Sequence, residues 1–361
     1  MKIWSAPSGD GAHIHDGSMI MTFAGPRTVI STSPFNGGLR RDLDHVFNHH
    51  CRPDADGAYV MRAPTYEEHL TIVAAELGLD PARCAGLSTA ASMDGLAIIS
   101  DACGSATVTA FATGGVEVNA CRPGDPAGWD EEAGLPSHRP GTINVILHFT
   151  CDLSDGALAR ALITLTEAKT AALHGLAVGS RCSHGLATGT GTDGAIVVAD
   201  PGSSVRLTDV GGHSRLGETV GRVACRAVEE ALMLQTMLGP ERQHDALRRL
   251  ERFGLTVASL WDRWRDAGGG GDRARFLDAL YGTSLLGDVV AGASLCAQMM
   301  DELEHGMLMP GDVGAAAGAI VDLLSRAPVP CAPLDAPALI ERVADALLRR
   351  VEEAYRGQDH R

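Results

Sequence analysis

The sequence predicts an α/β or α+β protein in which a layered mixed sheet packs with helices, followed by an all-helical C-terminal region. The first observation is that strand-like and helix-like apolar patterns are interspersed along residues 1–239. The second is that apolar residues after Gly239 and Pro240 recur at the three-to-four spacing of helices. The third is a hydrophobic content of 45% in 361 residues, which is enough for a large core. We therefore expect a first domain over 1–239 and a helical extension over 240–361.

Elements of the first domain are expected where the apolar period is close to two residues, for strands, or to 3.6 residues, for helices. Ser154 is a suitable N-cap for one helix, and Gly175 is a suitable end for it. Residues 32–51 begin with a Gly turn at 36–38 and are then expected to be helical. Three further helices are expected over 64–78, 154–175 and 216–238. Strands are expected over 18–23, 27–32, 85–89, 95–100, 106–113, 142–149, 183–188 and 194–199.

The C-terminal extension is expected to be a bundle of short helices. A Gly-rich turn over 268–271 separates two of them, and a linker containing Pro328, Pro330 and Pro333 precedes the last. Its Leu- and Ala-rich segments could pair between subunits, so we expect a homo-oligomer. The expected helices are 241–252, 256–266, 273–281, 286–305, 312–325 and 335–356.

Charge and composition exclude several classes of partner. The chain has 30 basic and 45 acidic residues, a formal net charge of −15, which argues against nucleic acid and against anionic membrane surfaces. No apolar run has the length of a membrane span, and the N-terminus lacks a signal core, so we expect a cytoplasmic protein. Nine scattered cysteines without a CxxC pair predict reduced thiols and no cysteine zinc site.

The segment GLATGTGTDGAIVV, from Gly185 to Val198, alternates threonine with glycine. If it is extended, its three hydroxyls share one face and the bare glycines allow close approach on the other. Asp193 adds a carboxylate to this polar group, which needs partners. We therefore expect substrate binding by Thr188, Thr190 and Thr192. The alternative is a tight loop that enters a strand.

Two charged residues stand near the end of the helix expected over 154–175. Glu167 and Lys169 are two residues apart, so they do not share a helix face. Glu167 has mostly apolar and Thr neighbours, and partial burial there would suit a general base. The alternative is an exposed pattern of helical charges. Asp193 is the second candidate base.

A catalytic site in which negative charge develops on a substrate oxygen also needs a group that stabilises that oxyanion. Lys169 and Asn144 are the candidates for this role. A covalent route through Thr142 or Cys121 is the alternative to an activated water, although no base is adjacent to the cysteine in sequence.

Polar residues also follow the strand expected over 106–113. Thr113 precedes Gly114-Gly115, and Asn119 and Arg122 follow at a strand end, where sites commonly lie. We expect all three polar residues to contact substrate. The alternative for 119–125 is a turn made by Pro123-Gly124-Asp125.

Histidines provide two further candidates. His45 and His49 are four residues apart, which on a helix is ligand spacing for zinc. Histidines at a helix end are the commoner explanation of the pattern, and no metal is assigned. His213 precedes the helix expected over 216–238, with Ser214 as its cap and Glu218 in its first turn. We expect His213 and Glu218 to contact substrate, and a loop histidine is the alternative.

Six motifs in order resemble the adenosylcobinamide amidohydrolases. They are GLSTAA, ATGGVEVNACRPGD, GTINVIL, LSDGALARALITLTEAKTAAL, ATGTGTD and HSRLGETVG, and the resemblance spans roughly 15–238. It implies hydrolysis of the amide between a corrin propionate and aminopropanol, giving adenosylcobyric acid and 1-amino-2-propanol for corrinoid salvage. The corrinoid is then the substrate, no cofactor is needed, and its cobalt is not a metal held by the protein.

Two other functions remain open at this point. One is a corrinoid-binding protein without hydrolysis, although the acidic residues Glu167, Asp193 and Glu218 are all present. The other is an unrelated metal-dependent amidase that uses His45, His49 and a carboxylate. The extension beyond 240 lies outside the resemblance.

Overall fold

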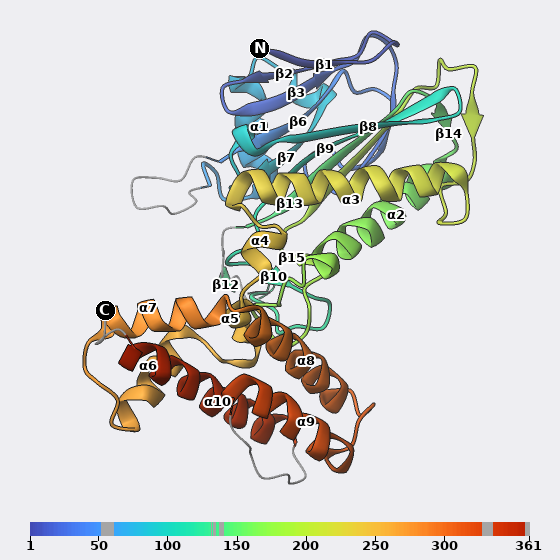
Figure 1. Cartoon of the computed structure of the whole chain (residues 1–361). Helices are drawn as coiled ribbons and strands as arrows, with labels where there is room; N and C mark the ends of the chain where they lie inside the picture. Colours follow the sequence, from blue (N-terminus) through green and yellow to red (C-terminus); the bar gives the residue numbers. More distant parts are fainter. Residues whose placement is uncertain (52–60, 131, 133–134, 137–140, 327–334, 358–361) are drawn as a thin grey trace. The chain divides into compact units, whose positions relative to one another are not determined.

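The computed structural model describes residues 1–51, 61–130, 132, 135–136, 141–326 and 335–357. The chain divides into two compact units. The first comprises Met1–Cys182 and Leu186–Gly239, and the second comprises Pro240–Arg361 with the short segment Ser183–Gly185. The predicted class is confirmed, because the first unit has mixed sheets with helices and the C-terminal region is all-helical (Figure 1).

A five-stranded sheet forms one half of the first unit. Its strand order is β1-β2-β3-β6-β7, and all neighbours are antiparallel except β6 and β7, which are parallel. The strands are β1 (Lys2–Ser5), β2 (Gly11–His15), β3 (Ser18–Thr22), β6 (His45–His50) and β7 (Cys84–Thr89).

A six-stranded sheet forms the other half, in the order β5-β4-β16-β13-β9-β8. Only β13 and β16 are parallel, and α2 (Asp155–Gly175) lies between them in the chain. The strands are β4 (Thr28–Ser31), β5 (Gly38–Arg40), β8 (Ala97–Cys103), β9 (Ala106–Gly114), β13 (Ile143–Phe149) and β16 (Gly194–Ala199). Short pairs join β10 (Ala120–Cys121) to β15 (Gly189–Thr190), β11 (Trp129–Asp130) to β12 (Leu135–Pro136), and β14 (Asp152–Leu153) to β17 (Arg206–Leu207).

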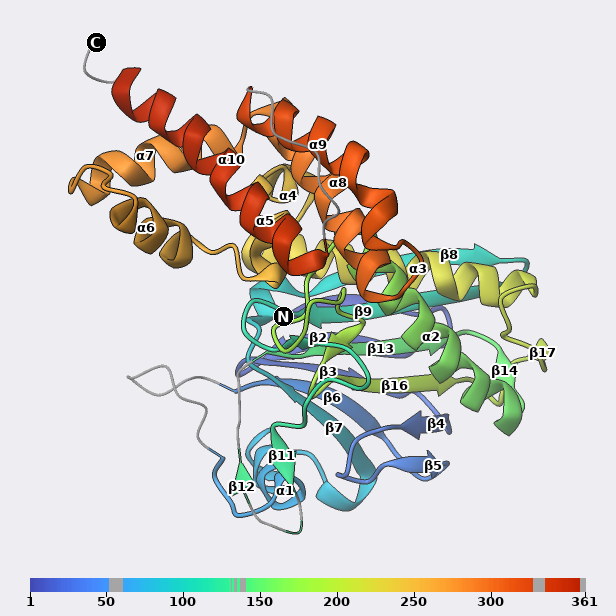
Figure 2. The same cartoon turned by 90° about the horizontal axis from the view of Figure 1, so that it is seen from below.

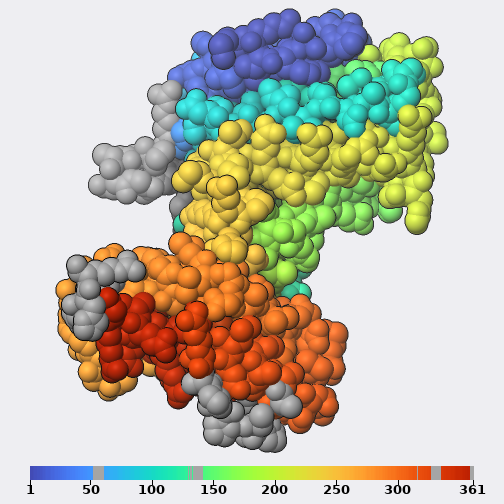
Figure 3. Space-filling view, in the orientation of Figure 1, coloured from blue at the N-terminus to red at the C-terminus, as the bar shows by residue number. Residues whose placement is uncertain are grey.

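The two sheets pack face to face and helices cover both outer faces. Residues on the facing sides form one apolar core, including Met21 and Leu87 from one sheet and Ile146 and Val198 from the other. Helix α1 (Tyr66–Glu76) covers the five-stranded sheet, and α2 with α3 (Arg215–Thr236) covers the six-stranded sheet. The layer order is therefore helix, sheet, sheet, helix (Figure 2). In Figure 3 the blue N-terminal strands and the yellow α3 lie on opposite sides of this unit.

Side chains along β13 point alternately to the two faces of the six-stranded sheet, so this strand packs both against the helices and against the other sheet. Val145 and Leu147 point to the helices, whereas Ile146 and His148 face the other sheet. Both faces are buried, so the strand reads as an almost continuous apolar run.

Most expected elements of the first unit are confirmed, with two corrections. Residues 183–188 form no strand: Leu186 makes a single isolated bridge to Gly179, and the strand β15 begins at Gly189. Residues 45–50 form strand β6 and not a helix, because Val46 faces the other sheet while Phe47 faces α1. Four residues along a strand span about 13 Å, so His45 and His49 are too far apart to share a metal ion.

The second unit has its own apolar core, which includes Phe276, Val289 and Leu347. The helix expected over 241–252 is broken, because the Asp245 side chain caps a new helix by accepting from Leu247 N at 2.9 Å. The proline linker predicted at 328–333 lies outside the described residues. The helices are α4 (Pro240–Gln243), α5 (Ala246–Leu250), α6 (Val257–Asp266), α7 (Arg273–Ser284), α8 (Gly287–Glu304), α9 (Pro310–Ser325) and α10 (Ala336–Gly357).

None of the described helices would cross a membrane by itself. The pair α7 and α8, bent by 77°, meets the length and composition test when the two are taken together.

A buried ion cluster joins the two sheets. The Asp10 carboxylate is fully buried and accepts from Arg27 Nε at 2.7 Å and from Arg27 Nη2 at 2.8 Å. His148 Nε2 lies 2.8 Å from the same carboxylate. Removing one partner of a buried pair leaves an uncompensated charge, so this cluster is sensitive to single substitutions.

Replacing Arg27 by methionine, Arg27→Met, is expected to lower the free energy of unfolding by about 3 kcal/mol, because Asp10 stays buried without the guanidinium that donates to both of its oxygens. The matched control is Arg40→Met, which breaks the pair with Asp42, a pair more exposed than that of Arg27 with Asp10. This variant is expected to change the free energy of unfolding by less than about 1 kcal/mol. Urea denaturation of the two variants measures the difference. Equal losses would contradict the role given to the cluster.

Candidate active site

The candidate site lies at one end of the two-sheet sandwich. The parallel strands β13 and β16 begin at this end, and register places Asn144 beside Gly194 of β16. The antiparallel neighbour β9 ends here, with Thr113 opposite Asn144. Asn48 near the end of β6 reaches the same place from the other sheet. Segments that are far apart in the sequence therefore meet at this end (Figure 1).

Asn144 is buried and fully hydrogen-bonded within the chain. Its Nδ2 donates to Asn48 Oδ1 and to Ser88 O, both at 2.9 Å. Its Oδ1 accepts from Gly194 N at 3.0 Å. A backbone carbonyl only accepts and a backbone N–H only donates, so the orientation of the amide is fixed. Both Nδ2 hydrogens are used, which leaves none for the oxygen of a substrate.

Asn48 was missed by the sequence analysis. Its Nδ2 donates to Thr113 Oγ1 at 2.9 Å, and both side chains are buried. Thr113 therefore belongs to the floor of the site, beneath the surface that a substrate would touch. HVFNHH carries no period-two signal that could have found Asn48, because its two apolar residues, Val46 and Phe47, are adjacent.

The Asp193 carboxylate is the most heavily bonded group of the site. Lys169 from α2 makes an ion pair with Asp193 Oδ2. Oδ2 also accepts from Thr190 N at 3.0 Å. Oδ1 accepts from Ile143 N at 2.8 Å and from Thr190 Oγ1 at 2.6 Å. Both charged side chains are mostly buried, at 14% exposed for Lys169 and 13% for Asp193, so water weakens the pair only in part.

The Gly–Thr segment is not extended throughout, so the expectation that its three hydroxyls share one face is wrong. After β15 the chain turns. The Thr190 hydroxyl then donates to Asp193, whereas the Thr192 hydroxyl donates to Gly141 O at 2.8 Å. The Thr188 backbone is held from both sides: its N–H donates to Cys121 O at 3.0 Å and its carbonyl accepts from Thr170 Oγ1 at 3.2 Å.

The glycines of this segment do allow close approach, but to side chains of the same chain. A Cβ atom on Gly189 would lie 2.2 Å from Asp193 Oδ2 and 2.8 Å from Lys169 Nζ. A Cβ atom on Gly194 would lie 2.8 Å from Asn144 Oδ1. Gly189 therefore makes room for the ion pair, and Gly194 makes room for Asn144.

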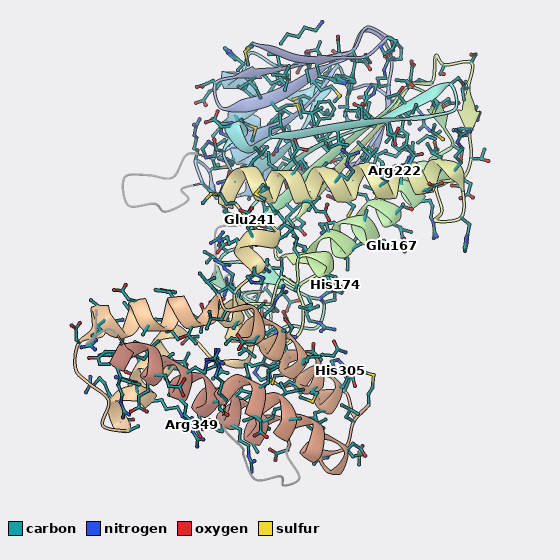
Figure 4. The ribbon with its side chains drawn as sticks, viewed as in Figure 1. Glu167, His174, Arg222, Glu241, His305 and Arg349 are labelled. Carbon is teal, nitrogen blue, oxygen red and sulfur yellow. The ribbon has the colours of Figure 1, made fainter. Side chains whose placement is uncertain are left out.

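Glu167, labelled on α2 in Figure 4, is exposed, so the expected partial burial is wrong. Helix α2 buries Thr164, Leu165 and Ala168 against the sheet, and Glu167 points away from that face. Lys169 lies on a different face, as the spacing predicted, and it alone of the two contacts Asp193.

The segment 119–125 lies beside the Gly–Thr segment, because β10 pairs with β15. Asn119 Nδ2 donates to Gly141 O at 2.9 Å, the same carbonyl that Thr192 contacts. Arg122 is half-buried, and its N–H donates to Asp125 Oδ2 at 3.0 Å. The turn predicted as the alternative for 119–125 is therefore present.

Cys121 lies in β10 beside Gly189, but its environment does not favour a thiolate. Burial raises the pKa of the Cys121 thiol, and the carboxylates of Asp193 and Asp125 raise it further. A nucleophilic cysteine needs the opposite shift.

His213 and Glu218 are not brought to this cluster. Both are exposed near the start of α3, where Glu218 pairs with Arg222 at 2.9 Å. Leu232, near the other end of α3, packs beside Gly114 at the end of β9. At 1.5 Å per helical residue, Glu218 is about 20 Å from that end.

A second polar group lies on the other side of β6, under α1. His49 Nδ1 lies 2.8 Å from Ser18 Oγ, and the His49 and His69 rings are 6.5 Å apart. Burial, followed by the nearby His69, lowers the pKa of His49 to about 4. Within the part of the chain that the structure describes, no three His, Cys, Asp or Glu side chains are grouped to hold a metal ion.

Comparison with known proteins gives the family of the chain. The family model described as adenosylcobinamide amidohydrolase matches residues 6–240. An uncharacterized protein of Methanocaldococcus jannaschii is 35% identical over 243 residues, 63% of this chain and 89% of that protein. A protein of Methanosarcina mazei named adenosylcobinamide amidohydrolase is 29% identical over 231 residues, 62% of this chain and 98% of that protein.

The chain belongs to the adenosylcobinamide amidohydrolase family. It is accordingly a hydrolase that acts on an amide bond. The family match ends at residue 240, so helices α5 to α10 of the second unit lie outside it.

Replacing Gly189 by alanine, Gly189→Ala, is expected to destabilise the protein by about 1–3 kcal/mol, because the new Cβ overlaps the Lys169–Asp193 pair. The matched control is Gly191→Ala, whose nearest contact would be Asn119 Oδ1 at 3.4 Å, an ordinary distance. Denaturant unfolding of both variants tests this. A Gly191→Ala variant as unstable as Gly189→Ala would contradict the packing described here.

Lowering the pH is expected to destabilise the first unit through His49. Its pKa is depressed in the folded state, from 6.5 to about 4, so the unfolded chain binds the proton first. The contribution of neutral His49 to the free energy of unfolding is fully present above pH 6.5. It is lost as the pH falls from 6.5 toward 4, and the loss amounts to about 3 kcal/mol at most. Urea midpoints of the wild type and of His49→Asn across this window measure it. Identical pH slopes for the two proteins would refute the assignment to His49.

Proposed function

We propose that this protein hydrolyses the aminopropanol amide of adenosylcobinamide, releasing adenosylcobyric acid and 1-amino-2-propanol. The observation that supports this most is the family match over residues 6–240, together with the name of the Methanosarcina relative. The corrinoid is the substrate, and we assign no bound cofactor. A salvaged corrinoid would in this way re-enter cobalamin synthesis, and we place the reaction in the cytoplasm.

The Lys169–Asp193 pair is the proposed catalytic centre. Amide hydrolysis needs a base for the attacking group and a positive or hydrogen-bonding group for the oxyanion. We assign the base to Asp193 and the oxyanion to Lys169, which has two further N–H groups beside the one that faces Asp193. Asn144 supports the site from below, because its amide hydrogens are already used. Glu167 has no contact with this pair that would give it a role.

Substrate contacts are proposed for polar groups at the surface of the same end. A corrinoid has a ring of amide side chains, which small donors and acceptors recognise. Thr192 is exposed, and Thr188, Asn119 and Arg122 are half-buried beside it. Thr113 is fully buried, and His213 and Glu218 lie at the far end of α3, so we leave these three out of the binding surface.

Incubation of the purified protein with adenosylcobinamide, without added metal, is the test of this function. Chromatography with mass detection is expected to show adenosylcobyric acid and aminopropanol in equal amounts. Unchanged corrinoid would contradict the proposal. A binding titration on the same sample would then separate a corrinoid binder from a protein of another function.

Two variants decide between the candidate bases. Asp193→Asn is expected to lower kcat by roughly 10²–10⁴-fold, because general-base catalysis contributes about this factor. Glu167→Gln is expected to remain within about twofold of the wild type, because Glu167 is exposed and lies on a different face of α2 from Lys169, which makes the ion pair with Asp193. A large loss for Glu167→Gln with a small loss for Asp193→Asn would reverse the assignment.

A further inference from the structure

The donors that surround Asp193 restrict which proton it can take. Two of its four contacts are backbone N–H groups, of Ile143 and Thr190, which do not give up their protons. The third is the Lys169 ammonium, whose charge holds the carboxylate in place. The fourth is the hydroxyl of Thr190 at 2.6 Å. A water molecule could reach the carboxylate only by displacing one of these groups.

We propose that the Thr190 hydroxyl is the nucleophile of the amide hydrolysis and that Asp193 is the base that accepts its proton. The inference rests on the proposed function, and it replaces direct attack by water with a covalent ester intermediate. It assigns Thr190 a catalytic role, where the sequence pattern had suggested substrate binding.

The orientation of the hydroxyl supports this role. Thr192 N donates to Thr190 Oγ1 at 3.3 Å, so one lone pair of the oxygen is taken and its own hydrogen points to Asp193. A hydroxyl within 2.6–3.2 Å of a base that a third group orients is the usual arrangement of an activated nucleophile. Here Lys169 is the third group.

The backbone around Thr190 holds it at the edge of the site. Thr190 pairs with Ala120 through β15 and β10, which fixes its position. Its exposed fraction is 9%, but the next residues, Gly191 and Thr192, are exposed. In the proposed reaction the substrate amide approaches the Thr190 hydroxyl across this exposed turn.

The other two candidate nucleophiles lack these features. The Thr142 hydroxyl donates to a backbone carbonyl, Thr192 O, at 2.7 Å, and a carbonyl is no base. The Cys121 thiol has a raised pKa, first because it is buried and then because carboxylates are near. Thr190 is the hydroxyl that the described part of this end places on the Asp193 carboxylate.

The proposed reaction balances in two steps. Thr190 Oγ bonds to the amide carbon while its proton moves to Asp193, and the Lys169 ammonium faces the developing oxyanion. The carbon–nitrogen bond then breaks, the proton on Asp193 passes to the amine, and 1-amino-2-propanol leaves. Water next attacks the ester carbon and gives its proton to Asp193. As the carbon–oxygen bond breaks, that proton returns to Thr190, and adenosylcobyric acid is released.

The test combines three variants with a trapping experiment on the full-length chain. Thr190→Val keeps the shape and removes the hydroxyl, and its rate is expected to fall by roughly 10³-fold or more. Thr190→Ser keeps a hydroxyl and is expected to stay within about tenfold of the wild type. The matched control is Thr109→Val, which removes another buried, hydrogen-bonded hydroxyl of this unit, 2.8 Å from Ser100 Oγ, and is expected to retain full activity.

Added hydroxylamine is expected to divert the wild-type ester to a corrinoid hydroxamate. Acid quenching during turnover is expected to leave a corrinoid-sized mass on the peptide that contains Thr190. The inference is overturned if Thr190→Val keeps more than a tenth of the wild-type rate. It is also overturned if the wild type cleaves adenosylcobinamide with neither hydroxamate nor labelled peptide. A wild type that does not cleave the substrate at all would contradict the proposed function, and this inference with it.

Discussion

The rest of the site depends on one carboxylate, that of Asp193, and on the cation beside it. Asp193 accepts from β13 through Ile143 N, from β15 through Thr190, and from α2 through Lys169. Three elements from separate parts of the chain therefore meet at two oxygen atoms. The ion pair fits because residue 189 has no side chain, which is the physical reason for the glycine. A carboxylate with this many hydrogen bonds is ordered and hard for water to reach, so the group next to it is the better candidate to react.

The floor beneath that carboxylate is a second constraint. Asn48 reaches from the five-stranded sheet and bonds both Asn144 and Thr113 of the six-stranded sheet, so the two sheets are joined where the site begins. A buried amide is tolerated only when its hydrogen bonds are satisfied. Here the partners of the Asn48 amide belong to the other sheet. The Asn144 amide in turn accepts from Gly194 N, so the position of the Gly–Thr turn depends on the packing of the two sheets.

Much of the fold could be predicted from the sequence, and the missed parts have physical reasons. Ser154 and Ser214 cap α2 and α3 as expected, because capping is a local interaction. Strand β6 was mistaken for a helix, since its two faces are buried against different layers and no polar face marks the period. Within the site, the different faces of Glu167 and Lys169 followed from spacing alone. Which of the two meets Asp193 did not, because that depends on how α2 packs on the sheet.

The proposed function places the reacting amide at the Lys169–Asp193 end of the sandwich. A crystal structure of the protein with adenosylcobyric acid, the product, bound is the sharpest test of this placement. The freed propionate carboxylate is expected about 3–3.5 Å from Thr190 Oγ and close to Lys169 Nζ, as a near-attack geometry requires. A product bound with that carboxylate far from both groups, for example beside His213 at the start of α3, would contradict the account.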